Sequence, residues 1–482
     1  MRMEGQVTRI RRNSVFAFLS QVIRLATNFL MFVGIARLYG VEAFGQFTTA
    51  HTFSTVFLLF ADFGFDSLLP TEIARRREQA AEYAQRYFSL KIVFALTASL
   101  AMSVLPVFRT FAPETRTLIH IFSFYVLFAS LNNFCFALFK GFEQFQHETK
   151  ISLVTNLLIL VLLVLLGLSH SPLWMIAVVF VGTRIIGVVV GLRIASRLTH
   201  ARVVGLNFRD WQNTWRPTMV FGLHFIFGNL FFQADTLLLA FWRGDHDVGI
   251  YQSVFKLITL ALVLPDIAIY TMMPVLSRLH QDARERWEEM GRLLYKVLFL
   301  LSLPVALTLF VFAEQIIGLL YGAGAFGEAI PILRVFAITV FVRYNAEGYA
   351  LMLTTSRSQS VRMIVVMFGT VLNIALNVFA IPAYGPGGAA MVSLVTNIAV
   401  AVGYITFSRM SVVKWSGTRR VVLPFFLTVV LCALTWNIRF VSLGLLLPPT
   451  LALFSVILYF VGLAPSERTL IFGADRGAII SQ

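Results

Sequence analysis

The chain has 482 residues, of which 58% are hydrophobic and only 13% are charged, with a mean hydropathy of +0.80 and a net charge of +15. This composition excludes an ordinary soluble globular protein, which carries about twice that share of charged residues. The two cysteines, Cys135 and Cys432, both lie in apolar stretches. Neither a disulfide framework nor a metal cluster is therefore expected.

Fourteen apolar stretches follow one another along the chain, and each is close to the ~20 residues that a transmembrane helix needs. We therefore expect an all-α, polytopic membrane protein of about 14 transmembrane helices. In chain order the stretches centre on Phe29, Leu58, Leu100, Leu127, Leu160, Val179, Phe231, Leu262, Leu303, Ile338, Ala375, Ile398, Val429 and Phe454.

The first stretch, residues 13–38, carries Arg24 near its middle. Arginine at the centre of a bilayer costs roughly 2.5–3.5 kcal/mol on insertion scales, so it persists where it lines a water-filled cavity or meets a partner. No acidic residue lies within two helical turns of Arg24. The sequence therefore predicts either an anionic cargo or a remote carboxylate beside it. The stretch is too long for a signal peptide and is expected to stay uncleaved.

Basic residues concentrate in alternate connections between the stretches. With the N-terminus inside, the inner connections and the termini hold 27 Lys and Arg residues, and the outer connections hold four: Arg109, Arg116, Arg243 and Arg439. This asymmetry is the positive-inside pattern. It predicts that both termini are cytoplasmic and explains the net charge without a nucleic-acid partner.

An ungapped offset of 204 residues places the first two stretches on the seventh and eighth. An even number of spans separates the copies, so both copies run in the same direction. Parallel repeats are related by an axis along the membrane normal, with a substrate site near the midplane between the halves. The matched residues are Gly40 with Gly244, Gly45 with Gly249, Phe47 with Tyr251, Asp62 with Asp266 and Pro70 with Pro274.

The repeat predicts two six-helix lobes related by a pseudo-two-fold axis, followed by two further helices. The predicted boundaries are residues 1–195 for the N-lobe (helices 1–6), 196–216 for a cytoplasmic linker and 217–408 for the C-lobe (helices 7–12). Residues 409–482 then hold helices 13 and 14 and a cytoplasmic tail.

Eight charged residues at membrane depth are candidates for function. Guanidinium and ammonium groups suit the oxygens of a phosphate, and buried carboxylates suit coupling to H+ or Na+. The substrate-binding candidates are Arg24, Lys256, Arg334 and Arg343, and the ion-coupling candidates are Asp62, Asp235, Asp266 and Glu347. No cofactor is expected, because the sequence lacks glycine-rich phosphate loops and Cys/His metal spacings.

Structural explanations of the same charges stay open. Asp235 and Lys256 suit an ion pair between neighbouring helices, while Arg343 and Glu347, four residues apart, suit mutual neutralisation. Arg184 is either deep in the membrane or extended toward its edge. Lys91 and Lys296 begin their apolar stretches, where their amines are expected to extend to the interface. Pro265 predicts a break in the eighth stretch, of the kind tolerated where a helix lines a cavity.

Several short runs carry a resemblance to a known family. In the first copy they are Ala36–Gly40, Phe44–Phe47, Ala61–Phe65 and Thr71–Arg75, and in the second copy they are Asp235, Val248–Tyr251 and Met273–Ser277. On these runs the chain resembles bacterial polysaccharide-repeat flippases, members of the multidrug/oligosaccharidyl-lipid/polysaccharide exporter superfamily, and the runs of the second copy resemble that family's seventh and eighth helices. The two extra C-terminal helices favour this branch over the twelve-helix drug antiporters.

The resemblance implies a flippase that moves undecaprenyl-diphosphate-linked oligosaccharide repeat units from the inner to the outer leaflet of the bacterial cytoplasmic (inner) membrane. The product would serve O-antigen, capsule or exopolysaccharide synthesis. Alternating access of two lobes around a cationic cavity is implied, and Arg24 matches a cavity arginine of related lipid-linked-precursor flippases. The implied partners are the lipid-linked oligosaccharide, membrane lipids, and a polysaccharide polymerase and glycosyltransferases.

Three alternatives stay open at this point. A cation-coupled drug or metabolite antiporter on the same fold would have a cavity dominated by carboxylates. A membrane enzyme, such as a polymerase or transferase, would need a large outer loop with catalytic residues, and the outer connections here are short. A peptidoglycan-precursor flippase would differ in the glycan rather than in the fold.

Overall fold

The computed structural model describes residues 2–201, 203–207, 211–322, 324–356, 358–411, 419–437, 443–462 and 467. These residues are almost entirely helical and contain no strand. Each of the fourteen predicted stretches is centred in a helix or, for Leu262, between two helices. The prediction of an all-α, polytopic membrane protein is therefore confirmed.

The chain divides into two compact units. Unit 1 comprises Met1–Lys256 with Ile381–Pro386, and unit 2 comprises Leu257–Ala380 with Gly387–Gln482. The predicted lobe boundaries stay predictions; residues 211–216 of the predicted linker form the start of a long helix, α7.

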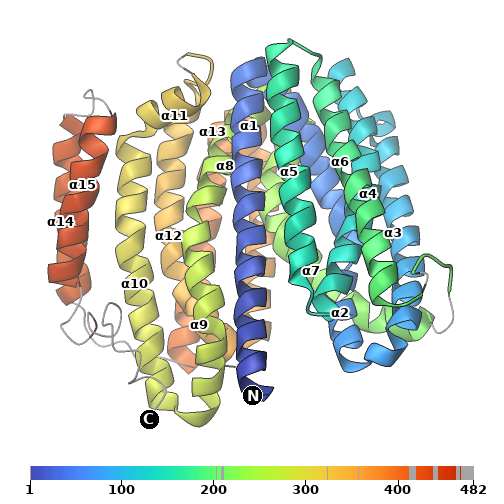
Figure 1. Ribbon diagram of the computed structural model, residues 1–482. Coiled ribbons are helices and arrows are strands. Elements are labelled where there is room, and N and C mark those ends of the chain that lie inside the picture. Colours follow the sequence, from blue (N-terminus) through green and yellow to red (C-terminus); the bar gives the residue numbers. More distant parts are fainter. Residues whose placement is uncertain are drawn as a thin grey trace. The chain divides into compact units, whose positions relative to one another are not determined.

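The helices that begin in unit 1 run mostly side by side (Figure 1). They are α1 (Arg2–Asp62), α2 (Phe65–Arg75), the 3-10 turn η1 (Arg77–Gln79), α3 (Ala80–Phe108), α4 (Pro113–Gly141), α5 (Phe145–Leu168), α6 (Leu173–Leu198), α7 (Trp211–Trp242) and α8 (Asp245–Ala261).

The remaining helices belong to unit 2, apart from the short part of α13 that unit 1 includes. They are α9 (Val263–Asp282), α10 (Arg284–Val311), α11 (Ala313–Tyr321), α12 (Ala329–Thr355), α13 (Gln359–Ser411), α14 (Arg419–Asn437), α15 (Leu443–Ile457) and the π-helical turn η2 (Leu458–Gly462).

The long helices α1 and α13 each contain two of the predicted spans. In each helix a glycine with a non-helical backbone conformation separates the two spans. Gly40 in α1 has φ 82° and Gly385 in α13 has φ 56°, backbone conformations that other residues rarely adopt. Pro265 marks the break predicted in the eighth stretch: α8 ends at Ala261 and α9 begins at Val263. Proline in a first helical turn is compatible with a helix start, because no intrahelical bond to its missing N–H is lost there.

Helix α5 shows the inverted polarity of a membrane helix. Its buried face carries the polar residues Thr149, Ser152, Thr155 and Asn156, whereas one continuous exposed face is apolar. The exposed residues recur at helical spacing: Leu153, Val154, Leu157, Val161, Val164, Leu165 and Leu168. Such a face suits contact with lipid, because an apolar patch of this extent is rare on soluble monomers.

The two copies of the sequence repeat meet at their matched glycines. A Cβ built on Gly45 would lie 1.8 Å from the carbonyl oxygen of Asp245, and a Cβ built on Gly249 would lie 2.3 Å from the carbonyl oxygen of Val41. Asp245 is the repeat counterpart of Val41, so the two approaches are the same contact made in both directions. Neither position has room for a side chain. This reciprocal glycine contact between α1 and α8 explains why the repeat keeps both glycines.

Substituting Gly45 with alanine is therefore expected to destabilise the protein by about 1–3 kcal/mol, the usual cost of overpacking. The matched control is Gly182→Ala in α6, where a Cβ would meet nothing within 4 Å. The control is expected to raise stability slightly, because alanine favours a helix over glycine. Thermal unfolding of the two purified variants measures both effects. Equal unfolding midpoints would contradict the conclusion that Gly45 has no room for a side chain.

Candidate functional site

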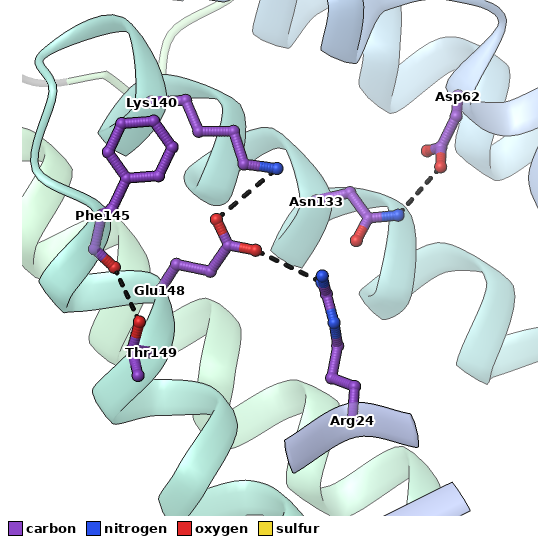
Figure 2. A network of polar contacts seen from close by, with 7 residues as sticks. All are labelled: Arg24, Asp62, Asn133, Lys140, Phe145, Glu148 and Thr149. Atoms are coloured by element: carbon purple, nitrogen blue, oxygen red, sulfur yellow. Dashed lines mark hydrogen bonds and ion pairs between the residues drawn. The ribbon is translucent and has the colours of Figure 1, made fainter. Parts of the chain in front are cut away.

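Arg24 forms an ion pair with a carboxylate far along the chain. Its Nη1 lies 3.2 Å from Oε1 of Glu148 in the first turn of α5, and Nζ of Lys140 in the last turn of α4 lies 3.5 Å from Oε2 of the same carboxylate. Figure 2 shows Glu148 between the two cations, which reach it from different helices. We call Arg24, Glu148 and Lys140 the ion trio. Of the two partners predicted for Arg24, the structure contains the remote carboxylate.

The ion trio lies toward one end of α5. At the other end, the hydroxyl of Tyr39 donates to the carbonyl oxygen of Ser171, 3.0 Å away, just beyond α5. The fifteen residues from Arg24 to Tyr39 span ~22 Å of helix at ~1.5 Å per residue. Arg24 thus lies near the start of the span that it shares with α5. The structure thus places Arg24 beside the first turn of α5, and its expected depth in the membrane stays a prediction.

A second cationic group lies among aromatic rings of unit 1. Nζ of Lys256 lies 3.9 Å from the ring centroid of Phe32, and Cζ of Arg184 lies 5.5 Å from that of Tyr125. Within the described part of the chain neither cation forms an ion pair, and the buried Nε of Arg184 has no hydrogen-bond acceptor. Cations over ring faces gain from the ring quadrupole but keep their positive charge.

His51 is a neighbour of these two cations. Both Lys256 and Arg184 are within electrostatic range of its imidazole. The imidazole also packs edge-on against Phe32, with centroids 5.3 Å apart, and against Phe122, 5.8 Å apart. We call Lys256, Arg184 and His51 the cationic aromatic cluster. Sequence reasoning named Lys256, left the depth of Arg184 open and missed His51. The signal available for His51 was its place in a run of hydroxyl residues, 48–55, inside an apolar span.

The predicted ion pair between Asp235 and Lys256 is not formed. Asp235 is buried in α7, and its Oδ2 accepts a hydrogen bond of 2.5 Å from the hydroxyl of Tyr251 in α8. Lys256 lies one and a half turns further along α8, over Phe32. The carboxylate and the cation are therefore stabilised separately, by a hydroxyl and by a ring.

Asp62 and Asp66 share one lysine. Nζ of Lys91 lies 3.0 Å from Oδ1 of Asp62 and also donates to Asp66. Asp62 accepts two more hydrogen bonds, from Ser130 at 2.7 Å and Asn133 at 2.9 Å. This buried triad of Asp62, Asp66 and Lys91 holds both sides of the break between α1 and α2, where Gly64 has φ 80°. Two carboxylates and one lysine leave it with one net negative charge.

The expectation that Lys91 extends to the membrane edge is wrong. Its side chain is 0% exposed, because α3 begins three turns earlier than the apolar stretch and places Lys91 well inside the helix. The same reason applies to Lys296, which lies inside α10 and forms an ion pair of 2.6 Å with Glu467.

The remaining candidates belong to unit 2. Arg343 lies within electrostatic range of both Glu347 and Asp266, so the charges that the sequence left separate on two helices are neighbours. Arg334 stacks its guanidinium over Trp436 of α14, with Cζ 4.8 Å from the ring centroid. Its buried Nε has no hydrogen-bond acceptor within the described residues.

The four substrate-binding candidates thus divide between the units: Arg24 and Lys256 belong to unit 1, and Arg334 and Arg343 to unit 2. The structure adds Arg184 and His51 to Lys256, and Lys140 to Arg24. Within the described residues no group of three or more His, Cys, Asp or Glu side chains is arranged to hold a metal ion.

Known proteins share both the sequence family and the fold. The model of a family described as polysaccharide biosynthesis protein matches residues 10–280, and that of a family described as MatE matches residues 221–379. A search of curated proteins finds no match.

Two solved structures illustrate the shared fold. A lipid II flippase MurJ in an inward closed conformation aligns with a TM-score of 0.74 at 14% identity, over 95% of this chain and 98% of its own. An inward-facing multidrug resistance MATE family transporter of the MOP superfamily aligns with a TM-score of 0.63 at 17% identity, over 83% of this chain and 97% of its own. Identities this low establish the fold alone. The polysaccharide family match, by contrast, covers more than half of the sequence. The chain therefore belongs to the polysaccharide biosynthesis protein family.

Proposed function

We propose that this protein is a flippase that moves undecaprenyl-diphosphate-linked oligosaccharide repeat units from the inner to the outer leaflet by alternating access. The observation that carries the proposal is the cationic aromatic cluster. Arg184 and Lys256 lie over rings rather than beside carboxylates. Their charge is therefore available to an anionic ligand such as a diphosphate, which Arg and Lys bind through charge-assisted hydrogen bonds.

Family and fold support the same reading. The family concerns polysaccharide biosynthesis, and one protein with this fold is a flippase of lipid II. The setting we propose is the bacterial inner membrane, with both termini cytoplasmic, and synthesis of O-antigen or another exopolysaccharide. A polymerase and glycosyltransferases would act on the same substrate, and an H+ or Na+ gradient would drive transport through Asp266 or Glu347, the two predicted coupling carboxylates in unit 2.

Two features weigh against the antiporter alternative. The carboxylate of Asp62 is held by Lys91, Ser130 and Asn133, and that of Asp235 by Tyr251. A coupling carboxylate must exchange its ion in every cycle, and each of these protein donors competes with that ion. The cations of the cluster, in contrast, carry no such carboxylate partner among the described residues.

The test is translocation in proteoliposomes. An undecaprenyl-diphosphate oligosaccharide, labelled on its sugar, is placed in both leaflets, and an impermeant quencher reports how fast the inner pool becomes accessible. We expect protein-dependent translocation, absent from liposomes that contain an unrelated membrane protein. Failure with several glycans, together with H+- or Na+-driven efflux of organic cations, would establish the antiporter instead.

A further inference from the structure

Glu148 is a buried carboxylate held between two partly exposed cations. The side chain of Glu148 is 5% exposed, that of Arg24 is 38% exposed and that of Lys140 is 41% exposed. The two cations come from α1 and α4 and meet on the one carboxylate of α5 (Figure 2). The ion trio therefore has one net positive charge, and its two cations still present surface to an external ligand.

The place of the ion trio defines which anions it meets. Lys140 lies in the last turn of α4 and Glu148 in the first turn of α5, so the trio lies where α4 ends and α5 begins. In the topology proposed from the charge pattern, this end lies at the inner leaflet. Phospholipid headgroups are abundant at that depth, and anionic ones attract clustered Lys and Arg. A bare Arg24–Lys140 pair would therefore bind the phosphodiester of an ordinary lipid most of the time.

The carboxylate of Glu148 competes with those headgroups for Arg24 and Lys140. A phosphodiester carries one negative charge, as the carboxylate does, so exchanging one for the other gains little. A diphosphate presents more charge and more acceptor oxygens, which engage both cations at once. Short charge-assisted hydrogen bonds of this kind are about twice as strong as neutral ones.

We infer that Glu148 is a specificity-determining residue: an internal anion that lets the Arg24–Lys140 pair, a site separate from the cationic aromatic cluster, accept lipid diphosphates and reject singly charged phospholipids. This inference rests on the proposed function, since it assumes a lipid diphosphate as substrate. Glu148 itself touches the two binding cations and need not touch the substrate. Its effect is exerted through the affinity of those cations for competing anions.

The test compares two lipids on the purified full-length protein. Binding of undecaprenyl diphosphate and of phosphatidylglycerol is measured in detergent for the wild type and for Glu148→Gln, which keeps the shape and removes the charge. We expect the wild type to prefer the diphosphate. In Glu148→Gln, phosphatidylglycerol should bind about tenfold more tightly, as expected when a hydrogen-bonded competing charge is lost, and the preference should fall by a similar factor.

Two further variants complete the design. Glu143→Gln removes an exposed carboxylate in the same connection, one that lies 3.7 Å from Arg77, and should leave the preference unchanged. Lys140→Met leaves Arg24 and Glu148 as a neutral pair, and should weaken diphosphate binding more than phosphatidylglycerol binding. This second variant decides the question if Glu148→Gln does not fold.

The outcomes separate the two proposals. A wild type that prefers the diphosphate, with the same preference in Glu148→Gln, would overturn the role of Glu148 and leave the flippase intact. A wild type that shows no diphosphate preference would overturn both. Equal weakening of both lipids in Lys140→Met would mean that the ion trio only holds α1, α4 and α5 together.

Discussion

Replacing Lys256 with methionine is expected to slow translocation of the lipid-linked oligosaccharide by ten- to a hundredfold. Methionine fills a similar volume beside Phe32 but carries no charge, so packing in unit 1 is kept while the cationic aromatic cluster loses one of its two fixed positive charges. A hydrogen bond to a charged group contributes about 1.5–3 kcal/mol, and ~1.4 kcal/mol corresponds to a factor of ten. The measurement is the initial translocation rate in proteoliposomes at equal protein density.

Two controls make the result specific. Lys150→Met removes the same charge from an exposed position in α5 and should leave the rate unchanged. Lys256→Arg keeps the cation and should restore a large part of the rate. If Lys256→Met transports at the wild-type rate while folding normally, the cationic aromatic cluster is not the binding site.

Replacing Lys91 with methionine is expected to lower the free energy of unfolding by about 3–5 kcal/mol, the usual cost of removing one partner from a buried ion pair. Lys91 is the only cation in the buried triad, and its side chain has no exposed surface. Without it, the neighbouring carboxylates Asp62 and Asp66 lose the cation that they share. The measurement is the shift in thermal unfolding of the purified protein, supported by denaturant unfolding in detergent.

The matching double variant, Lys91→Met with Asp66→Asn, tests the cause. It has the same net charge in the triad as the wild type, and Asp62 keeps its hydrogen bonds from Ser130 and Asn133. Most of the lost stability should return. Arg77→Met, which breaks an exposed ion pair with Glu143, should cost less than ~1 kcal/mol. If Lys91→Met lowered the free energy of unfolding by as little as Arg77→Met, the conclusion that Lys91 stabilises the buried triad would be wrong.

The fold was predictable from the sequence because the membrane leaves few choices. Backbone groups in lipid must bond within their own segment, so long apolar stretches become helices. The break at Pro265 and the importance of Gly45 and Gly249 were also predictable, because proline and glycine change the backbone at their own position in the chain. The apolar pattern did not predict how far α3 and α10 extend beyond it. Lys91 and Lys296 were therefore expected at the starts of their helices, whereas they lie well inside them.

The candidate site was only partly predictable, because its contacts join distant segments. Arg24 and Glu148 are 124 residues apart, and only the packing register of α1 against α5 brings them together. Residues four apart on one helix can be paired from sequence; residues on different helices cannot. His51 illustrates the same limit: its neighbours Arg184 and Lys256 come from α6 and α8.

The reciprocal glycine contact bears on how such a chain arises. The surface around Gly45 contacts its repeat copy around Gly249, and each glycine approaches the other helix in the same way. Such a surface is self-complementary, like the interface of a two-fold symmetric homodimer. Two identical half-length chains inserted in the same direction would already have possessed the Gly45–Gly249 contact. Gene fusion would then have joined surfaces that fitted each other beforehand. After fusion each half is free to diverge, and the unequal surroundings of Asp62 and its counterpart Asp266 record that divergence.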